Sequence, residues 1–567
     1  MKRLGFLILA GILPLYADTL AIIHINDTHH HLYPYKAWNG VSSAAYVIKR
    51  LKSLYPNHLF FHAGDIFVGD FSFPYGLGRV ELRILKNILR PDAITLGNHE
   101  FDITPDSLYA VLTDVGMPMP ILSANLTPDT LPISSIVQPY ATFIRSGKKI
   151  CVLGLTTNQF NILSPAQQPV QFENPVTVAQ NYEDTLTALG CDYRIILSHS
   201  GVNVDSAIAR QTRYYNLIIS GHTHTCYDSP AKIVNLSGDT TYFAEACSHY
   251  QAVGFWLIDL NTLRPISYTL IRLNNTTPID GETWDTLMAY KPLIESGFGN
   301  VFDDFWGYAP AEIPNIPDIP GYLDTPAGNL VADAMRVKSG ADAAAWPTFL
   351  IAEELQAGRI TSNNVLMLVP YGLDETYITG NNTRLLVATF TGKQIYNLLS
   401  TTQAFFGEQP IAQVSGMRYR YDPTSSPVML PSDIEIGGFP LDTNANYTLA
   451  VDKNIIYVAG LLGITPLRVD TTPYTVFEAV REYIRDLWIV EYHSEGRITY
   501  KNLSAYEIPT KTQRLNVLNR FVYSQTPMDI YDITGRLIAK GVYRFLAPKS
   551  GVYFIRLADK SVKVIIR

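Results

Sequence analysis

The sequence has few charged residues and no long run of basic ones. Only 17% of its 567 residues are Asp, Glu, Lys or Arg, and the formal net charge is -7. Binding to a nucleic acid polymer requires clustered Lys and Arg, so the composition argues against such a partner. Hydrophobic residues make up 47% of the chain, which excludes a disordered protein and supplies more than one hydrophobic core.

Cysteine is scarce and confined to the first half of the chain. The four cysteines are Cys151, Cys191, Cys226 and Cys247, and no two of them form a CxxC pair. The sequence therefore contains no zinc ribbon. Cys226 and Cys247 could form a disulfide between two neighbouring strands, or the cysteines could be buried thiols on core strands, because spacing alone does not give the pairing.

The one long apolar run lies at the N-terminus, in "MKRLGFLILAGILPLYADT". Lys2 and Arg3 precede an apolar stretch that ends at Leu15, and the small residue Ala17 follows. This order predicts a signal peptide over residues 1–17, the alternative being a buried N-terminal strand or helix. No later run is long enough for a transmembrane helix. We therefore expect a secreted protein without a transmembrane anchor, located in the periplasm, on the outer cell surface or outside the cell.

Five short apolar runs in the first half each lead directly into polar residues of metal-binding types. The runs are "LAIIHIN", "HLFF", "DAITLG", "YRIILS" and "NLIIS". Helix-like stretches such as "SSAAYVIKRLKSL" and "GRVELRILKNIL" separate them, so the pattern predicts an α/β sheet buried on both faces. In such sheets, functional groups collect at the carboxyl ends of the strands. The candidate ligands expected to meet there are Asp27, His29, Asp65, Asn98, His199, His222 and His224.

This set of ligands fits two metal ions better than one. A single catalytic zinc needs three protein ligands and an open position, whereas seven converge here and none is a thiolate. A mixed oxygen and nitrogen set with one shared carboxylate suits two divalent ions about 3.5 to 4 Å apart. Zn, Mn or a similar ion would satisfy these ligand types.

The blocks "NDTHHH", "GDIFVGD", "LGNHEFD", "LSHSGVNVD" and "SGHTHT" resemble those of calcineurin-like metallophosphoesterases. Their order, with "GNLVADAM" and "QVSGMRYRYD" in the second half, is similar to that of the secreted bacterial 5'-nucleotidase / UDP-sugar hydrolase family. The resemblance implies an α/β fold with a four-layer α/β/β/α catalytic domain and a second α/β domain that binds the substrate. The implied boundaries are a catalytic domain over 18–275, a linker helix and Pro-rich hinge over 276–322, and a 5'-nucleotidase-like C-terminal domain over 323–508.

The resemblance also implies a role for each site residue. Asp27, His29 and His224 would bind one ion, Asn98, His199 and His222 the other, and Asp65 would bridge them. His99 and Asp102 would form the catalytic dyad, with Asp102 orienting the imidazole. A metal-activated water would then attack phosphorus. His31 matches a further family histidine that would support the ligands, whereas the remaining histidines, His24, His30, His58, His62, His249 and His493, are expected to be structural.

The substrate pocket departs from the family pattern. The glycine and arginine motif expected after "GAD" is replaced by "AAAWPTFLIAEE". Near Gln413, the position of the first base-stacking ring holds Ile411, and that of the second holds Ile464. We therefore expect weak selectivity for a nucleotide base. Other side chains could compensate: Trp346, Phe349, Phe405 or Phe406 could supply a ring, and Arg359 or Arg418 a charge.

The chain after residue 510 changes to short strands and turns. "YDITGRL", "GVYFIRL" and the terminal "KVIIR" resemble the sorting domain of proteins exported by type IX secretion, the alternative being a generic β-sandwich. Residues 513–567 are predicted to form this small all-β sandwich. As a whole, the sequence predicts a secreted, 5'-nucleotidase-like phosphoesterase that hydrolyses small phosphate esters with two divalent ions. The alternatives are a thiosulfate-ester hydrolase of the same superfamily and a non-catalytic surface binding protein.

Overall fold

The computed structural model describes residues 18–35, 38–159, 170–373 and 384–501, and five strands between residues 515 and 566. The predicted signal peptide lies outside the described residues. The chain forms two compact units, which meet in sequence between Gly297 and Phe298. Among the described residues, no helix combines the length and the apolar character that crossing a bilayer requires.

The first sheet of unit 1 has seven strands in the order β15-β14-β1-β2-β3-β4-β6. The three strands that carry predicted ligands, β1, β2 and β3, are parallel neighbours in it. The strands are β1 (Thr19–Ile25), β2 (His58–His62), β3 (Ala93–Thr95), β4 (Ile121–Leu122), β6 (Val137–Gln138), β14 (Ala252–Asp259) and β15 (Arg264–Arg272).

The other two ligand-bearing strands, β10 and β11, belong to a second sheet with the order β12-β13-β11-β10-β8-β7. Its strands are β7 (Tyr140–Arg145), β8 (Lys148–Thr156), β10 (Tyr193–His199), β11 (Leu217–Ser220), β12 (Ala231–Val234) and β13 (Thr240–Glu245). The interpretation of the five apolar runs as one sheet is therefore wrong. A strand covered by a second sheet is as apolar on both faces as one covered by helices, so the pattern does not separate the two cases.

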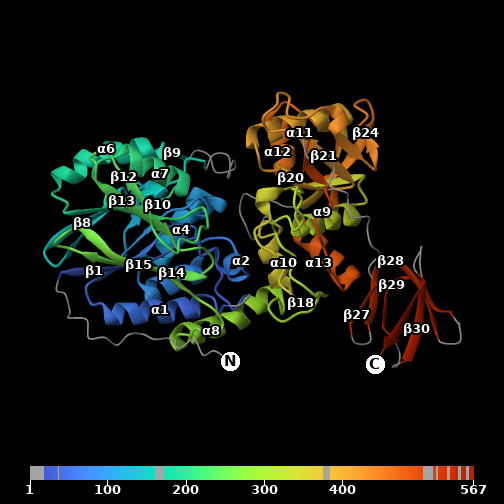
Figure 1. Ribbon diagram of the computed structural model, residues 1–567, viewed down its shortest axis with the longest axis horizontal. Coiled ribbons are helices and arrows are strands. Elements are labelled where there is room, and N and C mark those ends of the chain that lie inside the picture. Colours follow the sequence, from blue (N-terminus) through green and yellow to red (C-terminus); the bar gives the residue numbers. More distant parts are fainter. Residues whose placement is uncertain are drawn as a thin grey trace. The chain divides into compact units, whose positions relative to one another are not determined.

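Unit 1 has four layers, as the family resemblance implied. The two sheets pack face to face through a core that includes Phe61, Leu197 and Trp256. Helices α6 (Pro175–Ala188) and α7 (Val202–Gln211) pack on the outer face of the second sheet, and α1 (Val41–Leu54) covers the first (Figure 1). The remaining helices described are α2 (Ser72–Gly76), α3 (Arg79–Ile84), the π-helical η1 (Leu85–Leu89), the 3-10 turns η2 (His99–Asp102) and η3 (Pro132–Ser135), α4 (Pro105–Val115) and α8 (Gly281–Phe298).

Unit 1 contains two disulfides, Cys151–Cys191 and Cys226–Cys247. The alternative of buried thiols is therefore wrong. Cys151 lies near the start of β8 and Cys191 just before β10, at the amino ends of these parallel strands. Cys226 and Cys247 lie beyond the carboxyl ends of β11 and β13, on the same side as the predicted ligands.

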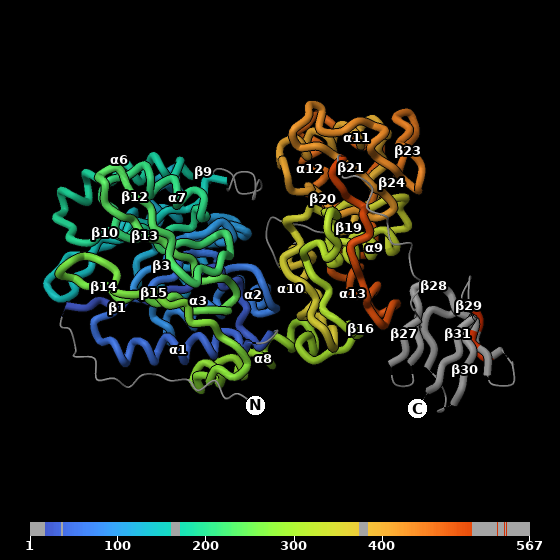
Figure 2. The backbone as a smooth tube through the Cα atoms, viewed as in Figure 1, coloured from blue at the N-terminus to red at the C-terminus, as the bar shows by residue number. Residues whose placement is uncertain are grey.

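Unit 2 has a mixed five-stranded sheet, β20-β17-β24-β19-β25, and a four-stranded sheet, β23-β22-β21-β26. The chain segments labelled β19, β20, β21 and β24 belong to this unit and are coloured yellow to orange-red in Figure 2. The strands are β17 (Ala343–Pro347), β19 (Arg384–Thr391), β20 (Ala412–Ser415), β21 (Met417–Tyr421), β22 (Ile434–Ile436), β23 (Phe439–Pro440), β24 (Asn446–Val451), β25 (Arg468–Thr475) and β26 (Ile498–Tyr500). The helices are α9 (Pro326–Ser339), α10 (Ser362–Leu368), α11 (Gly392–Phe406), α12 (Lys453–Leu461) and α13 (Val476–Leu487). The predicted second α/β domain is confirmed.

The C-terminal strands are antiparallel and form one hydrogen-bonded sheet, in which β28 pairs with β27, β29 and β30. Their bounds are β27 (Leu515–Leu518), β28 (Phe521–Asp532), β29 (Leu537–Leu546), β30 (Gly551–Arg556) and β31 (Ser561–Ile566). The described strands thus agree with an all-β tail, but they form one sheet and not the two sheets of the predicted sandwich.

Candidate metal centre

All seven predicted ligands lie at the carboxyl ends of strands from the two sheets of unit 1. The loop after β1 carries two of them, the segments after β2 and β3 one each, the end of β10 one, and the loop after β11 two. They are Asp27, His29, Asp65, Asn98, His199, His222 and His224. The two sheets therefore contribute to one cluster, which neither could form alone.

Five of these residues have left-handed backbone. The φ angles are 47° at Asp27, 46° at His29, 55° at Asp65, 85° at His222 and 55° at His224. Residues other than glycine rarely adopt this region, and each such residue costs about 1 to 3 kcal/mol. Their concentration at one place is typical of a functional site, where backbone strain is retained to aim side chains.

Asp65 lies at the middle of the cluster. Its Oδ2 is 2.9 Å from Nε2 of His199 and 3.8 Å from Nε2 of His29, and its Oδ1 accepts a hydrogen bond from the backbone N–H of His99 at 2.9 Å. Burial opposes its ionised form, but the nearby imidazoles of His199 and His99 hold the pKa of Asp65 well below its usual range. The Asp65 carboxylate is thus charged and faces imidazoles on two sides, the position of a bridging ligand.

One side of Asp65 contains His29, His224 and Asp27. The Nε2 atoms of His29 and His224 are 3.3 Å apart, and Nε2 of His224 is 3.4 Å from Oδ1 of Asp27. Two nitrogens bound at about 2.0 to 2.1 Å to one tetrahedral zinc would be separated by about 3.3 Å. Nδ1 of His29 donates to the carbonyl of Phe67 at 2.9 Å. This contact assigns the ring proton to Nδ1, so Nε2 keeps a lone pair that can bind a metal ion.

The other side of Asp65 contains His199, His222 and Asn98. One ligand atom each from Asp65, His199 and His222 lies within 4.8 Å of the others. Nδ1 of His199 donates to the carbonyl of Ala63 at 2.7 Å, which directs the other ring nitrogen toward Asp65. Oδ1 of Asn98 is buried and has no hydrogen-bond partner within the described part of the chain. A buried, unsatisfied amide oxygen costs about 1 to 3 kcal/mol, so a cation beside it would remove this penalty.

His199 and Asp65 approach closely without a hydrogen bond. Although Nε2 of His199 is 2.9 Å from Oδ2 of Asp65, the pair does not have hydrogen-bond geometry. Burial disfavours a charge on His199, yet the carboxylates of Asp65 and Asp27 raise the pKa of its imidazole to about 10. The two carboxylates thus favour positive charge at this position, which a divalent cation would also supply. The donor set and its electrostatics fit a metal centre.

His99 and Asp102 form a pair at the edge of this cluster. Within η2, Nδ1 of His99 lies 2.6 Å from Oδ2 of the buried Asp102, while the imidazole is 28% exposed. The His99 ring lies edge-on to that of His29, with centroids 5.0 Å apart. Burial lowers the proton affinity of His99, but the carboxylates of Asp102 and Asp65 outweigh it and raise the pKa to about 9. The pair is placed to hold a proton beside the ligands.

Two residues of the "GNHE" block, Gly97 and Glu100, support the loop that carries Asp65. Glu100 accepts hydrogen bonds from the backbone N–H groups of Asp65 and Ile66, at 3.2 and 2.6 Å, and burial raises its pKa to about 7. Gly97 lies so close to Asp65 that a Cβ at this position would be 2.1 Å from Oδ1 of Asp65. The "GNHE" block therefore does more than supply Asn98: its glycine makes room for the central carboxylate and its glutamate holds the Asp65 loop.

The other histidines differ in the residues that they contact. His31 donates from Nδ1 to the carbonyl of His29 at 2.9 Å, in keeping with the expected supporting role. His30 and His62 bond to Ile66 and Thr28, which adjoin ligands in the sequence, and His58 bonds to Tyr55; none of the three is in a group of described residues that could hold a metal ion. His249 differs from the structural role expected for it: it lies beside His29 and His224. His249 comes four residues after β13. Polar residues in this strand interrupt the kind of apolar run that precedes each of the other ligands.

The three residues predicted for the substrate pocket lie in unit 2. Gln413 is fully buried on β20, and its Oε1 accepts a hydrogen bond from the N–H of Thr325 at 2.9 Å. Ile464 is a member of the hydrophobic core of this unit, and Ile411 packs against that core. The sequence predicted only that Ile411 and Ile464 occupy the positions at which family members have base-stacking rings.

Phe349 follows a residue that is hydrogen-bonded to Ile411, and its ring lies against that of Phe406. The carbonyl of Ile411 accepts from the N–H of Thr348, the residue before Phe349. The rings of Phe349 and Phe406 are parallel, with an interplanar angle of 6° and centroids 5.9 Å apart. Phe349 is 47% exposed, and the neighbouring Phe405 is 68% exposed. Unit 2 thus presents an aromatic surface formed by residues that the family pattern does not use.

Two family models match the chain. Residues 20–226 match the calcineurin-like phosphoesterase model, and residues 318–458 match the 5'-nucleotidase C-terminal domain model. The first segment contains all seven predicted ligands with His99 and Asp102, and the second contains Ile411 and Gln413.

Known proteins are similar over one or both segments. The trifunctional nucleotide phosphoesterase protein YfkN of Bacillus subtilis is 27% identical over 486 residues, which are 78% of this chain and 32% of that protein. A snake venom 5'-nucleotidase of Naja atra is 33% identical over 219 residues, 36% of this chain and 41% of that protein. The chain thus spans less than half the length of these two relatives.

Solved structures are similar over most of the chain. A 5'-nucleotidase precursor from Thermus thermophilus has a TM-score of 0.74 at 25% identity, and the match covers 86% of this chain and 100% of that one. A sulfate thiohydrolase, also from Thermus thermophilus, has a TM-score of 0.70 at 17% identity and covers 88% of this chain and 99% of that one, a likeness of fold alone.

Proposed function

We propose that the chain, whose two segments match a calcineurin-like phosphoesterase domain and a 5'-nucleotidase C-terminal domain, is a metal-dependent phosphoric ester hydrolase of the 5'-nucleotidase type. The similar proteins are named as nucleotidases and phosphoesterases, which supports this reaction class. Divalent metal ions are the cofactors that the ligand set fits.

The observation that carries the proposal is the position of Asp65 between two groups of ligands. Asp27, His29 and His224 would hold one ion, Asn98, His199 and His222 a second, and Asp65 would contact both. Two bound divalent ions would supply Lewis-acid stabilisation of the phosphoryl group and activate the attacking water. The two carboxylates would neutralise only part of the charge of two divalent ions, so the centre keeps a positive charge that attracts a phosphate dianion.

His99 would assist the departure of the leaving group. Asp102 accepts from Nδ1 of His99, which fixes the ring so that Nε2 can carry the transferable proton. An imidazolium held in this way can donate its proton to the leaving oxygen, and it also places positive charge beside the phosphate. The partial exposure of the His99 ring gives a substrate access to it.

Nucleotides are the substrate class that the relatives suggest, with little selectivity for the base. A ring sandwich needs about 7 Å between its two rings, twice a contact distance of about 3.5 Å. The centroids of Phe349 and Phe406 are only 5.9 Å apart, so these rings stack on each other. A base could then stack only on an outer, exposed face, and stacking on one ring contributes about 1 to 3 kcal/mol.

We predict a small preference for nucleotides over simple esters. The ratio of kcat/KM for 5'-AMP to that for p-nitrophenyl phosphate should stay below about 10³, a factor that corresponds to about 4 kcal/mol. Steady-state phosphate release from the two substrates measures this ratio, and Phe349→Ala should lower it further if that ring contacts the base. A ratio above about 10³ would mean that a complete base pocket exists, against this proposal.

One assay series separates the reaction classes. The same metal-loaded sample is given a phosphate monoester, a nucleotide and a thiosulfate ester, and the release of phosphate or of sulfate is measured. Phosphate release from the first two is the expected result. Release from the sulfur ester alone would support the thiosulfate-ester hydrolase, and binding without turnover would support a surface binding protein.

We further propose that the protein is exported and that residues 513–567 direct it through type IX secretion. The apolar N-terminal run and the motifs "YDITGRL", "GVYFIRL" and "KVIIR" support this route. The two disulfides are consistent with an oxidising compartment. Fractionation of cells that produce the chain with and without residues 513–567 tests the route: the shortened chain should accumulate in the periplasm.

A further inference from the structure

His249 lies against two candidate metal ligands, although it is outside every ligand-bearing block of the sequence. One ring nitrogen each from His249, His29 and His224 lies within 4.8 Å of the others. We propose that His249 is an additional ligand of the ion that Asp27, His29 and His224 would hold. This proposal rests on the two-ion site proposed above and extends it by one residue.

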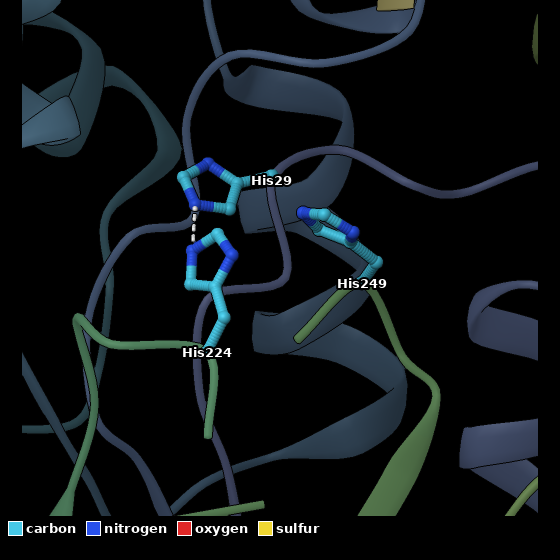
Figure 3. Close-up of side chains that lie close together, drawn as sticks. All are labelled: His29, His224 and His249. Atoms are coloured by element: carbon cyan, nitrogen blue, oxygen red, sulfur yellow. Dashed lines mark hydrogen bonds between the residues drawn. The ribbon is translucent and has the colours of Figure 1, made fainter. Parts of the chain in front are cut away.

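The three imidazoles surround a common point. The ring centroid of His249 is 5.5 Å from that of His29 and 5.2 Å from that of His224, and the latter two are also 5.2 Å apart. Their planes meet at 59° to 78°, so no two of them stack. Figure 3 shows the three side chains gathered from three separate chain segments, with the nitrogens of His29 and His224 facing each other. Rings that bind one ion through nitrogen adopt this kind of splayed arrangement.

The backbone and a neighbouring ring hold His249 in this position. Its N–H donates to the carbonyl of Asp27 at 2.7 Å, and its φ of 55° is again left-handed. Its imidazole stacks on that of His31, with centroids 3.8 Å apart and an interplanar angle of 13°. His31 in turn donates to the carbonyl of His29. His249 is therefore fixed to the loop after β1 that carries two ligands of the same ion.

The Cys226–Cys247 disulfide joins the loops that carry His224 and His249. Cys226 follows His224 by two residues, and Cys247 precedes His249 by two. The N–H of Cys247 also donates to the carbonyl of Thr225 at 3.2 Å, so the two loops are paired along their backbones as well. The covalent link keeps both imidazoles on the same side of the ion. We therefore assign the disulfide a positioning role in the metal centre.

A third imidazole would make the two ion positions unequal. The ion near His249 would have three nitrogen ligands besides carboxylate oxygens, whereas the other would have two nitrogens and the amide oxygen of Asn98. Imidazole suits zinc and other late transition metals, and oxygen ligands suit manganese and magnesium. The ion position near His249 should therefore favour zinc over manganese more strongly than the other position does.

The variant His249→Ala tests the proposal. Chelator competition on the metal-loaded full-length protein should show that the affinity for one of two zinc ions falls by at least about tenfold, the lower end of what even indirect support of a ligand contributes. The affinity for the second ion should change little. His58→Ala is the matched control: His58 begins β2 at the end opposite to Asp65, and its ring donates to the carbonyl of Tyr55. This control should keep both affinities.

A second pair of variants tests the same assignment without altering an imidazole. Cys226→Ser with Cys247→Ser should weaken zinc at the same position, while Cys151→Ser with Cys191→Ser should lower the unfolding temperature and leave both affinities unchanged. The second pair is a suitable control because that disulfide lies at the opposite ends of the strands. Cobalt substitution gives a spectroscopic readout, since the absorption of one of two bound cobalt ions should change in His249→Ala.

The outcomes separate this inference from the proposed function. A wild-type protein that binds no metal would remove the two-ion site and this extension with it. Two ions bound with equal affinity by wild type and His249→Ala, with unchanged cobalt absorption, would overturn only the role of His249. Unchanged affinities with a raised KM for a phosphate ester would assign the imidazole to the substrate and would also overturn the proposal.

Discussion

Replacing Asp65 with alanine is expected to remove both metal ions and nearly all activity. Asp65 contacts His199 on one side and His29 on the other, which is the position of a ligand that both ions would share. Without it, the buried imidazoles of His29 and His199 would lose the carboxylate that lies between them, and less negative charge would remain to hold cations. Metal-ion stabilisation contributes several kcal/mol to catalysis, and about 1.4 kcal/mol corresponds to tenfold, so kcat/KM should fall by at least about 10³-fold.

Elemental analysis and phosphate release from the same samples measure this effect. Wild type should carry close to two equivalents of metal, and Asp65→Ala well under one. Asp106→Ala, an exposed aspartate in the first turn of α4, is the control and should keep the metal and the activity of wild type. If Asp65→Ala kept two equivalents, Asp65 would not be the bridging ligand.

Replacing His99 with alanine should leave the metal in place and slow turnover by about 10²- to 10⁴-fold, the usual contribution of a general acid. His99 contacts the cluster through the edge of its ring, and its Nδ1 is already engaged by Asp102. One ring nitrogen of His99 lies within 4.8 Å of ligand atoms of His29 and Asp65, but because of its bond to Asp102 and its partly exposed ring we expect it to act on the substrate. Asp102→Asn should reproduce part of the loss because it removes the carboxylate that raises the pKa of His99.

The leaving group distinguishes a proton donor from a purely structural residue. The alkoxide leaving group of 5'-AMP needs a proton, whereas p-nitrophenolate departs readily without one. His99→Ala should therefore lose more activity on 5'-AMP than on p-nitrophenyl phosphate. Equal losses on both substrates would assign His99 to charge stabilisation alone, and an unchanged rate would exclude it from the reaction.

The sequence predicted the ligand positions well because each one follows an apolar run of strand length. Asp65 after "HLFF" and Asn98 after "DAITLG" are at the ends of buried strands, as expected. The pattern did not reveal that β10 and β11 belong to a second sheet, since a strand is equally apolar under a sheet or under helices. The second sheet was implied only by the family resemblance, which predicted four layers, and not by the periodicity of apolar residues.

The start of helix α13 can be predicted from the sequence, whereas the position of His249 cannot. Helix α13 begins at Val476, because Thr475 caps it in a capping box with Glu478, a signal present in the sequence as T-x-x-E. Pro473, just before this cap, lies on β25, an edge strand, where a missing N–H is tolerated. The position of His249 was not predictable in this way, since only the tertiary fold and the Cys226–Cys247 disulfide bring it to His224.

Metal titration of the metal-free protein tests the central claim most directly. Zinc or manganese is added stepwise to chelator-treated protein, and phosphate release from p-nitrophenyl phosphate is followed at each ratio of metal to chain. A two-ion centre predicts that activity is absent without metal and reaches its plateau at two equivalents per chain. Full activity in the metal-free protein, or a plateau at one equivalent, would contradict a phosphoesterase that works through a pair of ions bridged by Asp65.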